Sequence, residues 1–139
     1  MALRSEPAGA SAWLALALLA AAPTSAQAKT WNVGPCRLSV PSSWTVTGAT
    51  ANGPGSAGEV DEVDNGQASL GMETILPGNR VAHQDGDRTV MENVGPTGVG
   101  LVYAVAPVQP DRACHVRFTV DDPVAASAAT AAARTLKRR

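Results

Sequence analysis

Two cysteines, Cys36 and Cys114, restrict what this chain can fold into more than any other feature of its sequence. A bond between them would close a loop of nearly the whole folded part. The chain entropy removed from the unfolded state then corresponds to roughly 4.5 kcal/mol, an upper value. Whether the bond forms depends on the redox compartment in which the protein resides, and the N-terminal sequence addresses that question.

Residues 1–28 have the three regions of a cleavable secretion signal in the usual order. Arg4 supplies positive charge, Trp13 to Ala22 form an uninterrupted apolar run, and Ala26-Gln27-Ala28 offers small side chains to a signal peptidase. An uncleaved anchor is disfavoured because the run is too short to span a bilayer as a helix. A lipoprotein is disfavoured because Cys36 comes well after the run. We expect a periplasmic or secreted protein with no stable membrane insertion after cleavage.

In such an oxidising compartment the two cysteines allow one intramolecular pairing, and we expect a Cys36–Cys114 disulfide between the first and last strands of a sheet. Reactive thiols or metal ligands are the alternative. The cysteines are widely spaced, and no histidine accompanies them at ligand spacing.

Residues 29–139 have a length that suits a single small domain with one core. Acidic and basic residues nearly cancel, so no strong footprint of nucleic-acid or anionic-membrane binding is visible. Positive charge is clustered only in Arg134, Lys137, Arg138 and Arg139. At the end of a helix these residues would compensate the helix dipole.

Alternation of apolar and polar residues predicts strands through most of the domain. The alternation changes phase between Trp31 and Val40, so we expect a bulge or bend at Gly34-Pro35. The stretch from Thr47 to Gly58 is rich in glycine, alanine and threonine, which predicts an exposed and mobile loop. Four further strands are expected at 68–74, at 88–94 after an Asp85-Gly86 hairpin turn, at 99–105 and at 114–120.

The Asp121-Asp122-Pro123 sequence predicts the start of a helix, since it places a capping carboxylate before a proline. We expect the alanine-rich sequence from Val124 to Lys137 to be helical. The expected buried stripe consists of Val124, Ala128, Ala131, Thr135 and Leu136. The predicted fold class is therefore α+β: an antiparallel sheet of about six strands with a C-terminal alanine-rich helix packed on one face.

The segment Val40-Pro41-Ser42-Ser43-Trp44, which follows an N-terminal strand, resembles the opening of PsbP-like and DcrB-like domains. Those domains also end in a strand followed by an alanine-rich helix, here Cys114 to Lys137. The resemblance implies an exported accessory or binding protein without conserved catalytic residues, a group that includes some immunity proteins against secreted toxins. The resemblance assigns no functional residues to this chain.

Candidate residues for chemistry are few. His83 and His115 lie far apart, and neither has a second ligand at i+2 or i+4. No nucleophile, phosphate-binding or metal-binding motif is present, so we expect no cofactor and no metal. Either histidine could still act as a base after folding.

Four carboxylates, Glu59, Asp61, Glu62 and Asp64, gather within six residues and form what we call the acidic segment. They could be a solvated loop and edge strand that resists pairing with other chains. They could also be a surface that faces a basic protein partner. Calcium binding is the third interpretation, but Val63 occupies a position where a ligand is needed.

Two function hypotheses follow. The first is an exported non-catalytic protein-interaction module, of the accessory, inhibitor or immunity type, that binds another protein through the acidic segment and the neighbouring flexible loop from Thr47 to Gly58. The second is a small periplasmic or secreted hydrolase with dispersed catalytic residues. A cleft that gathers His83 or His115 with a serine and an acid would favour the hydrolase.

N-terminal sequencing of the exported protein checks the secretion signal. Because Ala26 and Ala28 meet the peptidase requirement, the mature chain is expected to begin at Lys29. Exported material that begins at Met1 would contradict the signal, whereas a start a few residues away would only move the cleavage site.

Overall fold

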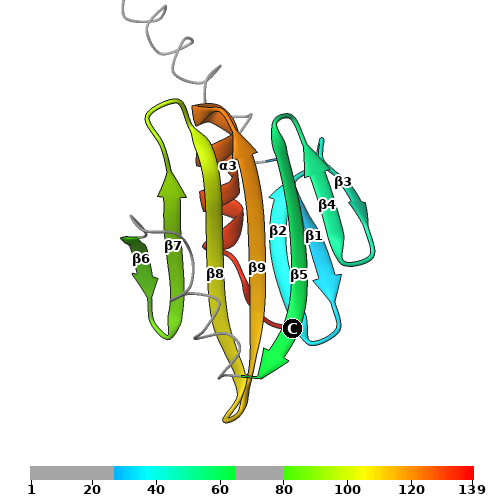
Figure 1. Cartoon of the computed structure of the whole chain (residues 1–139). Coiled ribbons are helices and arrows are strands. Elements are labelled where there is room, and N and C mark those ends of the chain that lie inside the picture. Colours follow the sequence, from blue (N-terminus) through cyan, green and yellow to red (C-terminus); the bar gives the residue numbers. More distant parts are fainter. Residues whose placement is uncertain (1–26, 65–79) are drawn as a thin grey trace, which may run out of the picture.

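The computed structural model describes residues 27–64 and 80–139, which form two antiparallel sheets and one helix (Figure 1). The elements are β1 (Ala28–Val33), β2 (Cys36–Pro41), β3 (Thr45–Thr47), β4 (Thr50–Gly53), β5 (Ser56–Asp64), β6 (Arg80–Asp85), β7 (Arg88–Val94), β8 (Val99–Gln109), β9 (Arg112–Asp121), α3 (Pro123–Ala133) and β10 (Lys137–Arg138). The α+β class is therefore confirmed. The strand expected at 68–74 lies outside the described residues.

The expected single sheet of about six strands is wrong in detail. The larger sheet has seven strands in the order β3-β4-β5-β9-β8-β7-β6, and the smaller one has three in the order β1-β2-β10. The helix α3 packs against β8 and β9 and also contacts β2 of the small sheet. The helix and the small sheet therefore share one face of the large sheet, which leaves the opposite face, here called the outer face, to carry the polar positions (Figure 1).

Strand alternation explains where the core lies. In β9 every second residue is buried, and those side chains face α3 and the small sheet. Trp31, Leu38 and Val40 complete this core from the small sheet. The strands expected at 88–94, 99–105 and 114–120 are confirmed, with β8 and β9 longer than expected.

The disulfide is confirmed, but the strands it joins differ from those expected. Cys36 lies in β2 of the small sheet and Cys114 lies in β9 at the centre of the large one. Their Cα atoms are 5.6 Å apart, within the range that a disulfide requires. Both side chains are fully buried. The bond therefore joins the two sheets through the core and does not link the edges of a single sheet.

The loop expected between Thr47 and Gly58 is wrong, because most of this stretch forms β4 and the start of β5. Its small residues instead make room for two aromatic rings. A side chain on Gly53 would collide with the indole of Trp44, and a Cβ on Gly58 would lie 2.5 Å from the ring of Phe118. These two rings pack edge to face, with centroids 5.8 Å apart. The glycines thus serve core packing, a role that composition alone does not reveal.

The Gly34-Pro35 pair also differs from its expected role. It forms a two-residue turn between β1 and β2, which pair directly with Val33 opposite Cys36. Gly34 has φ of +54°, a conformation that favours glycine at the first position of such a turn. The change of phase in the sequence therefore marks a chain reversal and not a bulge. The hairpin expected at Asp85-Gly86 is confirmed between β6 and β7.

The helix begins where it was expected and ends earlier. The Asp122 side chain accepts a hydrogen bond from the Ala125 N–H at 2.8 Å, but α3 ends at Ala133. Of the expected buried stripe, Leu136, which follows the helix, is buried and Ala128 packs against the core while partly buried, whereas Val124 is 80% exposed and Ala131 is exposed. The buried positions are Ala125, Ala129, Ala132 and Ala133. The fully buried positions of the helix thus present only methyl groups to the core, and this lets the helix approach the sheet closely.

Removal of the disulfide tests how strongly the two sheets depend on it. The double variant C36A/C114A is expected to lose about 2–5 kcal/mol of unfolding free energy, because the unfolded chain regains the entropy of a long open loop. Chemical denaturation monitored by tryptophan fluorescence measures the loss. An unchanged denaturation midpoint would show that packing alone holds the small sheet in place.

Candidate functional site

The acidic segment lies in β5, and the strand distributes its carboxylates over both faces of the sheet. Glu59 and Asp61 pair with Arg117 and His115 of β9 on the outer face. Glu62 and Asp64 have the opposite orientation, since successive residues of a strand alternate. The edge-strand interpretation holds for part of the segment: β4 pairs with residues 56–59 of β5, whereas residues 61–64 extend beyond β4 and, among the described strands, pair with β9 alone.

Glu59 and Glu62 form ion pairs across the strands. Glu59 Oε2 lies 3.2 Å from Arg117 Nη2, and Glu62 Oε1 lies 2.9 Å from Arg112 Nη2. These pairs are solvent-accessible and neutralise part of the charge that the sequence concentrates here. Across residues 27–64 and 80–139, no group of three or more His, Cys, Asp or Glu side chains is placed to hold a metal ion.

A polar groove of about 240 Å³ lies on the outer face over β4, β5 and β9. It is smaller than the roughly 300–1,000 Å³ that small-molecule sites usually enclose. Its polar side chains are exposed and belong to paired strands. The lining residues are Thr50, Asn52, Ala57, Gly58, Glu59, Arg117 and Thr119. With neighbouring Asp61, we call this area the outer polar surface.

His115 lies beside this surface, stacked on Tyr103 with ring centroids 5.7 Å apart. Its Nε2 is buried and has no hydrogen-bond partner among the described residues. Burial lowers the pKa of His115 below its usual value of 6.5, Asp61 opposes that shift, and Arg117 adds to it. The imidazole is therefore neutral at physiological pH, and its buried nitrogen is poorly placed to act as a base.

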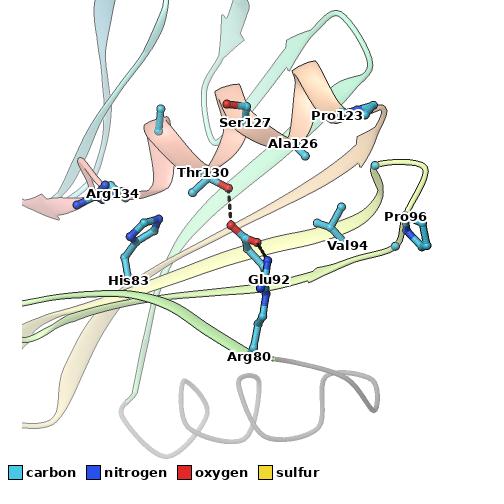
Figure 2. A pocket seen from close by; sticks show the side chains of 13 residues that line it. Arg80, His83, Glu92, Val94, Pro96, Pro123, Ala126, Ser127, Thr130 and Arg134 are labelled. Atoms are coloured by element: carbon cyan, nitrogen blue, oxygen red, sulfur yellow. Dashed lines mark hydrogen bonds and ion pairs between the residues drawn. The ribbon is translucent and has the colours of Figure 1, made fainter.

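His83 lies elsewhere, in a groove of about 570 Å³ between the β6–β7 hairpin and α3 (Figure 2). We call this the helix groove. It gathers the residue types that a hydrolase would use, namely His83, Ser127 and Glu92. It also contains Arg80, Thr130 and Arg134. Sequence reasoning singled out only His83, because the other side chains come from distant elements.

The hydrogen bonds in the helix groove do not form a catalytic relay. Glu92 is held by Arg80 at 3.0 Å and by the Thr130 hydroxyl at 3.3 Å. Figure 2 shows the His83 ring near Arg134 and separated from Ser127 along the helix. No hydrogen bond joins His83 to Ser127 or to Glu92 in the part of the chain that the structure describes. A nucleophile activated by a base needs such a bond.

An ionic cluster around Asp85 was missed by sequence reasoning. Asp85 accepts two hydrogen bonds from Arg134, at 3.2 Å each, and lies 3.4 Å from Arg88. The hydrogen bond from Arg134 is the main reason that the pKa of Asp85 lies below its usual value. The i,i+3 spacing of Asp85 and Arg88 in the sequence is a weak indication of their ion pair. The contact between Asp85 and Arg134 forms only because the helix packs beside the hairpin.

No family model, curated protein or solved structure matches this chain. In the described ranges, no helix is long and apolar enough to cross a membrane.

The buried environment of His115 predicts that the stability of the folded protein depends on pH. Because burial lowers its folded pKa, this histidine contributes stability that is complete above the unfolded pKa near 6.5 and declines as the pH falls below it. Asp61→Asn should lower the pKa of His115 further, and Arg117→Gln should raise it. NMR titration of the imidazole protons measures both shifts. Glu62→Gln, on the opposite face of β5, is the control and should leave the pKa in place. A higher pKa in Asp61→Asn would contradict the assignment.

Proposed function

We propose that this protein is an exported, non-catalytic protein-interaction module that binds a partner with basic side chains through the outer polar surface. The observation that carries the proposal is the fixed placement of Glu59 and Asp61 on the outer face of β5. Two carboxylates against the single guanidinium of Arg117 leave this surface negative, since His115 is neutral. An exposed negative surface favours a basic partner.

The rigidity of the surface supports binding of a protein. Most of its side chains, Glu59 and Arg117 included, belong to backbone paired on both sides, and Asp61 is paired with β9, so little backbone entropy is lost when a partner docks. Glu59 and Arg117 keep 60% and 49% of their side-chain area exposed, and this area is available for contact. The small groove suits one inserted side chain better than a small-molecule ligand.

Export is supported by two independent features. The N-terminal sequence has the order of a secretion signal, and the buried Cys36–Cys114 disulfide is typical of proteins that fold in an oxidising compartment. The resemblance of Val40 to Trp44 to PsbP-like and DcrB-like openings agrees with a periplasmic or secreted accessory protein.

The split of the acidic segment between two faces allows a charge-matched test. Tagged protein is used to capture a partner from periplasmic extract and culture supernatant, and binding is then measured by a biosensor. The variants E59K/D61K and E62K/D64K change the net charge equally, so long-range steering changes equally in both. E59K/D61K alone removes contacts on the outer face, and we expect it to weaken affinity by about tenfold more than E62K/D64K.

Thermal unfolding serves as the control, because exposed substitutions seldom change stability by more than about 0.5 kcal/mol. Equal affinities of the two variants would contradict docking on the outer face. A p-nitrophenyl ester assay tests the hydrolase hypothesis, for which the helix groove supplies the residue types. If the wild type hydrolyses the ester and this activity is lost in both His83→Ala and Ser127→Ala, the hydrolase hypothesis replaces the proposal.

A further inference from the structure

A third groove, with a volume of about 550 Å³, lies between the small sheet, the β6–β7 hairpin and the end of α3. Four of its side chains are cationic, and none of its lining residues is acidic. We call it the basic groove. The lining residues are Thr30, Arg37, Leu38, Ser39, Arg88, Arg134, Thr135 and Lys137. It lies apart from the outer polar surface, and its volume is within the range of small-molecule sites.

The basic groove exists because the helix ends early. Lys137 and Arg138 form β10, which pairs with β2, so compensation of the helix dipole is the wrong interpretation for them. In this pairing Lys137 lies directly opposite Arg37. Opposite residues of an antiparallel pair project on the same face, and two like charges in that arrangement destabilise the sheet.

No neighbouring acid relieves this repulsion. Within the described residues neither Arg37 nor Lys137 forms a salt bridge. Asp85 is engaged by the other two cations of the groove, Arg88 and Arg134. Arg88 also donates to the Leu136 carbonyl at 3.0 Å. The single carboxylate of Asp85 thus serves two of the four cations, and the other two remain uncompensated.

We propose that the basic groove binds a small tetrahedral oxyanion with two negative charges, either a phosphoryl group or inorganic sulfate. The two uncompensated cations match that charge, and a bound dianion removes the repulsion between Arg37 and Lys137. The guanidinium of Arg37 offers the planar pair of donors that suits such an oxyanion, and Lys137 adds a mobile point charge. The adjacent ion pairs of Asp85 hold Arg88 and Arg134 at the wall of the groove.

Titration of the purified protein with inorganic phosphate tests this site. The titration is followed by amide NMR at constant ionic strength and about pH 7.5, where phosphate is mostly a dianion. Saturable shifts are expected around Arg37, Ser39 and Lys137. R37Q/K137Q should bind phosphate at least about tenfold more weakly, because each charge-assisted contact contributes that much or more. Parallel titrations with sulfate and acetate show whether the site prefers a phosphoryl group or sulfate. The anion, phosphate or sulfate, that gives the stronger response identifies the preferred ligand.

The matched control is K29Q/R138Q, which removes the same charge from the same small sheet but from residues that do not line the groove. It should retain the phosphate response. In phosphate-free buffer R37Q/K137Q should unfold at the same or a higher temperature than the wild type, since a repulsion is removed. Equal weakening by both variants, a response to acetate as strong as to the dianions, or no saturable shift would overturn the proposal.

Discussion

The covalent bond between Cys36 and Cys114 is the constraint on which the rest of the structure depends. It attaches the middle strand of the small sheet to a central strand of the large one inside the core. The third strand of the small sheet, β10, contributes only Lys137 and Arg138, so the small sheet is little more than a two-stranded hairpin, which is marginally stable alone in water. Tied to β9, it covers the part of the large sheet that α3 leaves open, and its Trp31, Leu38 and Val40 complete the core.

The same arrangement creates both candidate sites. The helix and the small sheet occupy one face of the large sheet, so Glu59, Asp61 and Arg117 remain on the outer face. Where the helix ends, the chain turns to pair with β2, and the cations of the C-terminus meet Arg37. A chain whose net charge is nearly zero thereby separates a negative surface from a positive groove.

Small residues decide how closely these layers approach. Gly53 and Gly58 leave room for the Trp44 and Phe118 rings, and the buried face of α3 is made of alanine methyl groups. Close packing of this kind tolerates added atoms poorly. The apparent low complexity of these segments is therefore a requirement of the core and does not indicate a mobile loop.

Local patterns in the sequence were sufficient to predict the disulfide and the α+β class. They also predicted the strands at 88–94, 99–105 and 114–120 and the helix cap at Asp122. Each of these follows from alternation, from capping chemistry or from the only possible pairing of two cysteines. Local patterns could not show that the Cys36 strand belongs to a second sheet, that Val124 faces solvent, or that β5 divides its carboxylates between two faces. The meeting of Arg37 with Lys137, and of Asp85 with Arg134, was likewise decided only by tertiary structure. These contacts join residues far apart in the chain, and strand register and helix docking bring them together after the core has packed.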